Sequence, residues 1–156
     1  MKYLLDTDHL SILQAPERAE QGPLIGRLPR DEWHEVAVSI ICFHEQVLGA
    51  NAYISRANNV SGLVRGYRLL GSIIEDFSKM TVLLFDAKSA KVFDNLRSQR
   101  IRVATIDLRI ASIALTRGLV LLTRDTRDFG RIPGLVTEDW TLRDRGNGDG
   151  AGRGGP

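Results

Sequence analysis

Short apolar runs alternate with longer stretches of helical periodicity along this chain. The runs have strand length and are apolar on both faces, which indicates strands buried on two sides. They predict strands at residues 3–5, 36–38, 82–85, 119–122 and, more weakly, 135–137. Between them, apolar residues recur at spacings of three and four, as is typical of helices with one buried face. This order predicts an α/β fold in which helices cover both sides of a parallel sheet.

Residues that favour helix ends support four of these helices. N-cap residue types stand at the expected starts, where their side-chain oxygens can accept a hydrogen bond from the first turn. The pairs are Ser39 before 40–57, Ser61 before 62–77, Asp86 before 87–98 and Thr105 before 106–117. Gly118 fits the C-terminal end of the fourth helix. Residues 14–35 contain three prolines and are expected to form a short helix between loops.

Length and composition indicate one domain. The chain has 156 residues, of which 43% are hydrophobic and 26% charged, enough for a single core over residues 1–142. Residues 146–156 include six glycines, and such a segment buries too little apolar surface to offset its ordering entropy. Residues 143–156 are therefore expected to be a Gly-rich flexible tail without chemistry.

The apolar runs are too short for a membrane protein. None reaches the length of a membrane span, and Asp6, Asp8 and His9 interrupt the first one. We therefore expect neither a membrane anchor nor a signal peptide, but a cytoplasmic protein. The single cysteine, Cys42, lies in an apolar run and is expected to pack in the core.

The formal net charge of +2 conceals a basic segment. Residues 97–131 carry eight arginines, three aspartates and no lysine, a local charge of +5, which leaves −3 for the rest of the chain. Arginine makes planar, bidentate contacts with phosphate, although a run of charges is also typical of a solvated helix face. Charge alone therefore makes nucleic acid one candidate ligand without establishing it.

Carboxylates follow two of the predicted strands directly. Asp6 and Asp8 come after the first strand, and Asp125 and Asp128 after the fourth. Ligands of open parallel sheets bind beyond the carboxyl ends of the strands, so these side chains are expected at one edge. The alternative is structural, because Asp6 and Asp125 could be turn residues or helix caps. Asp86 also follows a strand, but a clear helix starts there and capping is its preferred role.

Two further carboxylates lie on apolar helix faces. Glu45 is predicted to lie on a buried stripe, because the residues that share its face are small or apolar: Ile41, Leu48, Gly49 and Ala52. Asp107 falls in the first turn of the fourth helix, beside Ile110, Ala111 and Ala114. As structural alternatives, Glu45 could pair with a buried arginine, and Asp107 could serve only the helix dipole.

Carboxylates gathered at one sheet edge require a counter-charge. They repel one another and would be protonated or unstable unless a hard cation neutralised them. Oxygen-rich sites of this kind suit Mg²⁺ or Mn²⁺. Zinc is not expected, because His9, His34 and His44 are scattered and Cys42 is alone. His44 points to a different helix face from Glu45 and is expected at the surface or behind the ligands.

Several stretches resemble the PIN-domain ribonucleases, and in particular the VapC toxins of bacterial VapBC toxin–antitoxin pairs. "YLLDTDHLS" (3–11) resembles the family's opening strand and its Asp-Thr-Asn/Asp motif. "VSIICFHEQVLGA" (38–50) resembles the second motif, a Ser followed by a helix that bears Glu-x-x-x-Gly. "IDLRIASIALTRGLVLLTRDTRDFGRIPGLVTEDW" (106–140) resembles the third and fourth motifs. The resemblance covers about residues 1–140.

This resemblance implies a fold, an activity and partners. The implied fold is a PIN-like three-layer α/β/α sandwich with a central parallel sheet, assembled as a homodimer. The implied activity is Mg²⁺-dependent (or Mn²⁺-dependent) endonucleolytic hydrolysis of RNA by a metal-activated water. The implied partners are an RNA substrate and a cognate VapB-like antitoxin.

The resemblance also assigns roles to individual residues. Asp6, Glu45 and Asp107 become metal-site and catalytic carboxylates, with Thr7 and Thr123 as supporting hydroxyls. At the fourth acidic position many relatives have Asn where Asp125 stands and keep the later Asp, whereas this chain has both. Asp125 is preferred as the closer ligand, with Asp128 behind it or acting as a cap. The arginines expected to hold RNA phosphates are Arg100, Arg102, Arg124 and Arg127.

Three other interpretations stay open. "LLDTDHL" (4–10) partly matches the Asp-x-Asp-x-Thr/Val motif of haloacid-dehalogenase-like phosphatases, but Leu10 stands where Thr or Val is required. A non-catalytic PIN-like module that grips RNA or a protein would not need clustered carboxylates. A PIN nuclease of RNA processing would differ from a toxin in lacking a small antitoxin gene immediately upstream.

Overall fold

The computed structural model describes residues 1–28 and 33–142. Five parallel strands form one sheet in the order β3-β2-β1-β4-β5. Leu4 at the centre pairs with Ala37 on one side and Leu121 on the other. The strands are β1 (Tyr3–Leu5), β2 (Val36–Ser39), β3 (Thr81–Leu83), β4 (Val120–Leu122) and β5 (Thr137–Glu138). The five predicted strands are all present, with ends displaced by one or two residues, and the predicted tail lies outside the described residues.

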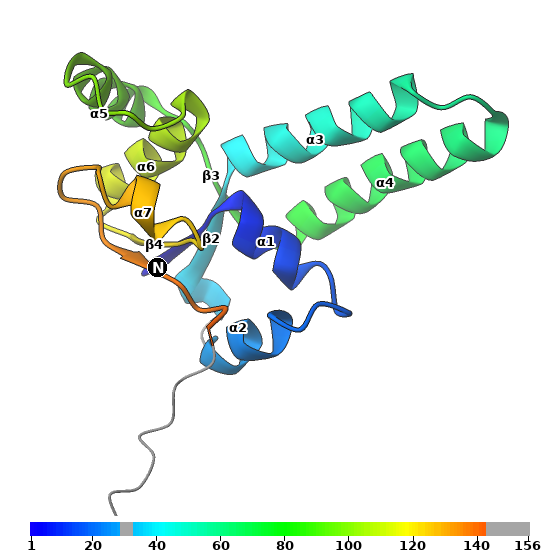
Figure 1. Ribbon diagram of the computed structural model, residues 1–156, viewed down its shortest axis with the longest axis horizontal. Helices are drawn as coiled ribbons and strands as arrows, with labels where there is room; N and C mark the ends of the chain where they lie inside the picture. The colour runs from blue at the N-terminus through cyan, green and yellow to red at the C-terminus, as the bar shows by residue number, and fades with distance from the viewer. Residues whose placement is uncertain (29–32, 143–156) are drawn as a thin grey trace, which may run out of the picture.

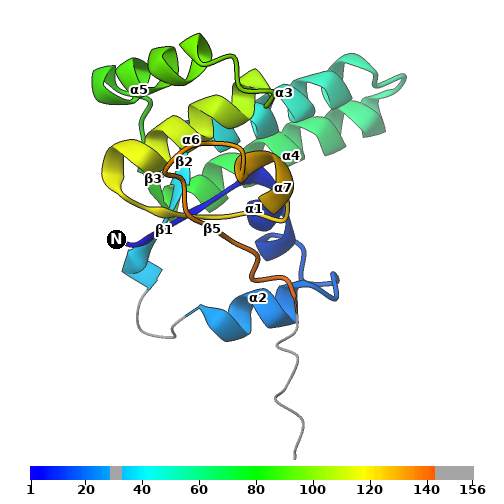
Figure 2. The same cartoon turned by 60° about the vertical axis from the view of Figure 1, so that its left-hand side comes forward.

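The helices divide between the two faces of the sheet. They are α1 (Thr7–Leu13), α2 (Gln21–Arg27), α3 (Ile40–Ser55), α4 (Val60–Ser78), α5 (Ala87–Ser98), α6 (Thr105–Arg117) and α7 (Thr126–Phe129), with a 3₁₀ turn η1 (Trp33–Glu35). From β1 to β3 the chain moves outward in one direction, and from β3 to β5 it moves back across the sheet. Right-handed crossovers therefore place α1–α4 on one face and α5–α7 on the other, as Figures 1 and 2 show. The predicted α/β/α sandwich is confirmed.

The core lies between these layers. Leu4, Leu5, Leu121 and Leu122 in the two central strands are at most 1% exposed. Cys42 is fully buried, as expected, and burial raises the pKa of its thiol. Within the described residues, no helix combines the length and apolar character that crossing a membrane requires.

Three of the predicted helix ends are confirmed and two are wrong. Ser39 caps α3 and Asp86 caps α5, each accepting a hydrogen bond from a first-turn N–H, and Gly118 ends α6 with a φ of +62°. The cap of α4 is Asn59 rather than Ser61. Asn59 stands two residues before Ser61, is an equally good capping residue, and its side chain accepts a hydrogen bond from Gly62 N. α6 begins after Ala104, so Thr105 is its first helical residue and does not cap it.

α3 and α4 form a long hairpin that projects from the sheet (Figures 1 and 2). The two helices approach closely at Gly66, where an added Cβ would lie 2.5 Å from Ile54 Cγ1. Ile41 at the base of α3 is buried, but Leu48 is 52% exposed and Gly49 is exposed too. The predicted buried stripe around Glu45 is therefore wrong beyond the first turns of α3, since the helix has left the sheet there.

Candidate functional site

The strand order reverses between β1 and β4, and the carboxyl ends of these two strands meet there. Asp6 N donates to Leu122 O at 3.0 Å, which joins the end of β1 to the end of β4. The crevice of an open parallel sheet lies at such a reversal. Residues that follow β1 and β4 therefore face the same space, together with the first turns of α3 and α6.

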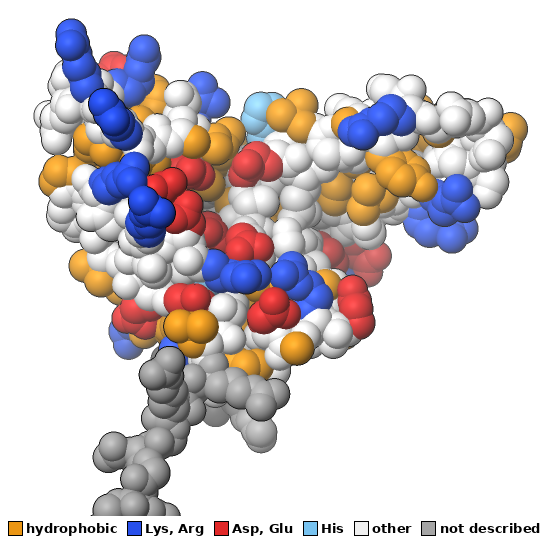
Figure 3. Space-filling view, viewed as in Figure 1, with side chains coloured by type: hydrophobic (Ala, Val, Ile, Leu, Met, Phe, Trp, Pro, Cys, Tyr) orange, Lys and Arg blue, Asp and Glu red, His pale blue; other side chains and the backbone are white. Residues whose placement is uncertain are grey.

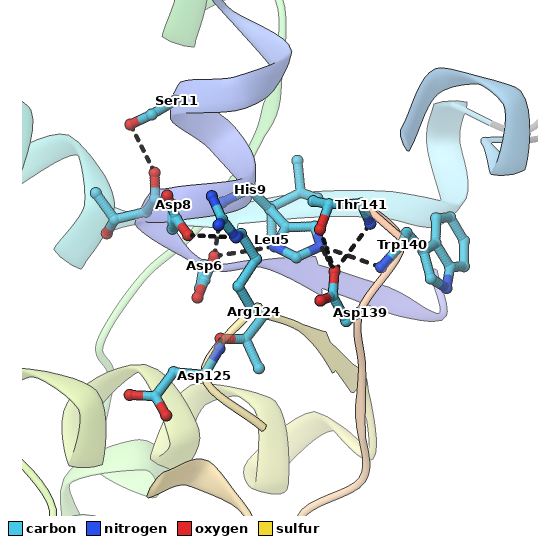
Figure 4. A network of polar contacts seen from close by, with 12 residues as sticks. Leu5, Asp6, Asp8, His9, Ser11, Arg124, Asp125, Asp139, Trp140 and Thr141 are labelled. Atoms are coloured by element: carbon cyan, nitrogen blue, oxygen red, sulfur yellow. Dashed lines mark hydrogen bonds and ion pairs between the residues drawn. The ribbon is translucent and has the colours of Figure 1, made fainter. Parts of the chain in front are cut away.

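Asp6 lies at the centre of this edge and is only 6% exposed. It is the N-cap of α1, and its Oδ1 accepts a hydrogen bond from His9 N at 2.8 Å. Figure 4 shows its second carboxylate oxygen pointing away from His9, on the side of Asp125. Asp6 is therefore a helix cap, as the structural alternative predicted. Capping uses only Oδ1, so Oδ2 is left for a ligand.

Glu45 approaches this edge from α3. The Thr7 hydroxyl donates a hydrogen bond to Glu45 Oε2 across 38 residues of sequence. Within residues 1–28 and 33–142, Glu45 makes no ion pair with an arginine or lysine. The alternative in which a buried arginine explains Glu45 is therefore wrong for the part of the chain that the structure describes.

Asp107 reaches the edge from the opposite layer. It lies in the first turn of α6, whose next turns bury Ile110, Ala111 and Ala114. Burial, and after it the charges of four other carboxylates, together raise the pKa of Asp107 from 3.8 to about 6. In decreasing order of effect these are Glu45, Asp125, Asp6 and Asp128. The four other predicted carboxylates therefore all lie near enough to Asp107 for their charges to act on it.

Asp125 and Asp128 differ in their surroundings. Asp125 is the N-cap of α7, and its Oδ1 accepts from Asp128 N at 3.0 Å. Its own N–H donates to the hydroxyl of fully buried Thr123 at 3.0 Å, which fixes the turn after β4. Asp128 forms an ion pair with Arg131 at 3.4 Å. Asp128 is thus partly neutralised by a neighbour of its own.

Carboxylate oxygens are the ligand type that a hard cation prefers, but the described carboxylates do not form a complete coordination site. Among the described residues, no three His, Cys, Asp or Glu side chains are arranged closely enough to hold a metal ion directly. Mg²⁺ commonly binds proteins through one or two carboxylates and keeps several of its waters. An all-oxygen donor set whose charges oppose one another at Asp107 is chemically compatible with a hydrated cation of this kind.

The predicted phosphate-binding arginines are exposed, and they differ in whether they already form ion pairs. Figure 3 shows Lys and Arg side chains gathered over α5, α6 and α7 next to a band of Asp and Glu. Arg100, Arg102 and Arg127 are exposed. Arg124 is also exposed but pairs with Asp8 at 3.5 Å and with Glu20 at 3.7 Å.

The sequence pattern does not indicate one residue that lies behind the site. His9, which we had expected only as one of three scattered histidines, is fully buried directly behind Asp6 (Figure 4). The other two histidines lie away from it, and His44 is exposed, as expected. The one sequence feature that could have indicated this position is the spacing of three residues between Asp6 and His9. This spacing places His9 in the first turn of α1, next to the Asp6 side chain that caps the helix.

Comparisons with known proteins agree with this geometry. No family model matches the chain. A protein named ribonuclease VapC1 from Rickettsia felis is 31% identical over 142 residues, which is 86% of this chain and 93% of that relative. The chain belongs to the VapC ribonuclease family. A VapC named as a tRNA(fMet)-specific endonuclease, from Shigella flexneri, is 40% identical over 75 residues, 45% of this chain and 57% of that relative.

A solved structure extends the VapC comparison to the fold. The DNA-bound VapBC complex of Salmonella typhimurium contains a chain 28% identical to this one, with a TM-score of 0.68. The match covers 90% of this chain and 98% of that one. The VapC fold is thus present over nearly all of the described residues, and the acidic edge lies within it.

Proposed function

We propose that this chain is a divalent-cation-dependent endoribonuclease and the toxin of a VapBC-type toxin–antitoxin pair. Membership of the VapC family supports the nuclease class. The observation that supports the site is the meeting of Asp6, Glu45, Asp107 and Asp125 at the strand reversal, where burial and then the charges of the neighbouring carboxylates raise the pKa of Asp107 to about 6. Carboxylates from both layers, one of them destabilised by the others, are best explained by a cation that offsets their charge.

The carboxylates would hold Mg²⁺ or Mn²⁺, which supplies a polarised phosphoryl oxygen and a water of lowered pKa when bound. Asp6 and Asp107 would be the principal holders, because Asp6 is buried and the raised pKa of Asp107 marks the carboxylate whose charge most needs an offset. Thr7 orients Glu45 through its hydroxyl, and Thr123 fixes the turn that carries Asp125. Asp125 would contact the cation or its water, whereas Asp128 with its own arginine would stay behind it.

The basic residues beside the acidic edge would hold the RNA backbone. Arg100, Arg102 and Arg127 can contact phosphates without breaking an ion pair among the described residues, while Arg124 must exchange its contacts with Asp8 and Glu20. Phosphate contacts of this kind fix affinity and position without reading the base sequence. The carboxylates and arginines together therefore suit hydrolysis of a phosphodiester bond.

A protein partner is supported by the projecting hairpin. Large apolar side chains are exposed along α4, among them Val60 at 75%, Tyr67 at 61% and Ile74 at 59%. Exposed apolar surface of this extent is typical of interaction sites, and the similar Salmonella structure is a VapBC complex. We assign the partners as a VapB-like antitoxin and a second copy of the chain.

The proposal is tested with purified protein, total RNA and induced expression. Cleavage should require Mg²⁺ or Mn²⁺, stop with chelator, and fall by at least about two orders of magnitude in Asp6→Asn, as expected for loss of a metal ligand. The matched control is Asp86→Asn, another aspartate that follows a strand and caps a helix, and it should cut normally because Asn also caps. Induction should halt growth only with the cleaving proteins. Cleavage without a cation, or growth arrest by a non-cleaving variant, would contradict the proposal.

A further inference from the structure

His9 carries a polar nitrogen that is buried and has no hydrogen-bond partner. The ring is 0% exposed, and Nδ1 makes no hydrogen bond within the described residues. Such a group costs free energy unless something compensates it. The carboxylate that faces Nδ1 is that of Asp6, whose Oδ1 lies 3.5 Å away, slightly beyond ordinary hydrogen-bond length. The side chain is therefore aimed at the carboxylate that we place at the centre of the site.

The other nitrogen fixes which way the ring proton points. His9 Nε2 accepts a hydrogen bond from Trp140 N at 3.3 Å. A ring nitrogen that accepts carries no proton, so the proton of the imidazole is on Nδ1, facing Asp6. His9 therefore presents a donor to Asp6 and an acceptor to Trp140 at the same time.

The far side of the ring is held by a rigid segment. The Trp140 indole packs edge-on against Tyr3 of β1, with ring centroids 4.6 Å apart, and its Nε1 donates to Glu138 Oε2 at 2.6 Å. Asp139 Oδ1 lies 3.6 Å from His9 Nε2 and is itself held by Thr141 N and Oγ1 at 2.9 and 2.6 Å. Figure 4 shows Asp6 on one side of the His9 ring and Asp139, Trp140 and Thr141 on the other, and the hydrogen bond that links the ring to this segment is the one from Trp140 N. His9 thus connects the segment after β5 to the end of β1.

We propose that His9 is a positioning residue: its Nδ1 edge faces Asp6 Oδ1 and orients this carboxylate, while its Nε2 ties the ring to the segment 139–141 through Trp140 N. Its backbone N–H and its ring both address Oδ1, so Oδ2 is directed to the opposite side, where the other carboxylates lie. Partners of this kind orient metal ligands, and their loss typically weakens metal affinity about 10- to 100-fold. The inference rests on the proposed function, because it assigns Asp6 to the cation.

Two substitutions separate the two nitrogens. His9→Asn retains an amide nitrogen at the place of Nδ1 but cannot reach Trp140. His9→Gln can place its amide oxygen at the position of Nε2 but has no donor at the position of Nδ1. If His9 served only packing, the smaller His9→Asn variant should have both a lower melting temperature and a lower Mn²⁺ affinity than His9→Gln.

The test measures Mn²⁺ affinity, from the electron paramagnetic resonance signal of the free ion, beside the melting temperature in chelator. We expect His9→Gln to melt close to the parent and to bind Mn²⁺ about tenfold or more weakly. His9→Asn should melt lower, because Trp140 N–H loses its acceptor, and should bind Mn²⁺ with affinity close to the parent's. Parental Mn²⁺ affinity in His9→Gln, or affinities that follow the melting temperatures across both variants, would overturn the inference. A parent that binds no Mn²⁺ would instead overturn the proposed function and the inference with it.

Discussion

Replacing Asp107 by Asn should make the cation-free protein more stable at neutral pH. The carboxylate of Asp107 is partly buried and lies among four other carboxylates, and both effects raise its pKa from 3.8 to about 6. The folded chain therefore carries an ionised group that it disfavours. Asn has nearly the same shape but no charge, and no hydrogen bond of the Asp107 side chain within the described residues would be lost.

The size of the effect follows from the pKa. A rise from 3.8 to about 6 is a difference of about 2, which corresponds to about 3 kcal/mol at about 1.4 kcal/mol per pKa unit. Because the side chain is only partly buried, solvent screens its repulsion, and we expect about 1–2 kcal/mol in the free energy of unfolding.

The raised pKa of Asp107 also determines how the stability difference between Asp107→Asn and the parent changes with pH. Below pH 3.8 Asp107 is protonated in both the folded and the unfolded chain, and the stabilisation from its raised pKa is fully present. As the pH rises through about 6, the unfolded chain gives up the proton first, and this stabilisation is lost. The advantage of Asp107→Asn should therefore grow between about pH 4 and 6 and then level off.

The assay is urea unfolding of both proteins in chelator at acidic and neutral pH. The matched control, Asp86→Asn, should show the opposite sign at neutral pH. The N–H of Ser89, and after it the Ser89 hydroxyl and Arg117, lower the pKa of Asp86, so its charge stabilises the fold above its ordinary pKa. Saturating Mg²⁺ should then raise the stability of the parent more than that of Asp107→Asn. Equal stability of parent and Asp107→Asn at neutral pH would refute the reasoning.

Three further predictions concern other parts of the molecule. Replacing Arg100 and Arg102 together by Ala should lower the salt dependence of RNA binding by about one unit of slope per lost phosphate contact, measured on a non-cleaving protein; an unchanged slope would show that they only solvate the surface. Asp125→Asn should weaken Mn²⁺ binding in calorimetry more than Asp128→Asn, because the latter carboxylate already has an arginine partner; the reverse order would exchange their roles. Gly118→Ala should lower the free energy of unfolding by about 1 kcal/mol or more, since φ is +62° there; an unchanged urea midpoint would contradict this.

The sequence predicts that carboxylates gather at one edge of the sheet, and their role there stays a prediction. Each strand is a short apolar run, and residues that follow parallel strands lie at the carboxyl edge of the sheet. Asp6 follows β1 directly and Asp125 follows β4 by three residues, so both are expected at this edge, whereas the pairing of β1 with β4 comes from the structure. Asp107 was predictable from its own neighbours, since a first-turn aspartate beside Ile110 and Ala111 is bound to be partly buried.

Helical periodicity does not predict burial correctly where apolar residues do not face the sheet. Leu48 and Tyr67 have helical spacing like core residues, yet the α3–α4 hairpin carries them into solvent. Periodicity shows which residues share a face, but it does not show what that face contacts. His9 was missed for a related reason, since its role depends on Trp140, which is 131 residues away in sequence.

The central claim is that the carboxylates at the strand reversal cut RNA with a bound cation, and Glu45→Gln tests it most directly. Gln keeps the volume of Glu45 and an oxygen that can accept from Thr7, but it removes the charge. The measurement is Mg²⁺-dependent cleavage of total RNA per folded molecule, beside the melting temperature in chelator. We predict that Glu45→Gln melts no lower than the parent and cuts at least about a hundredfold more slowly, as for loss of a group that holds the cation. A stable Glu45→Gln protein that cuts at the parental rate would contradict the account.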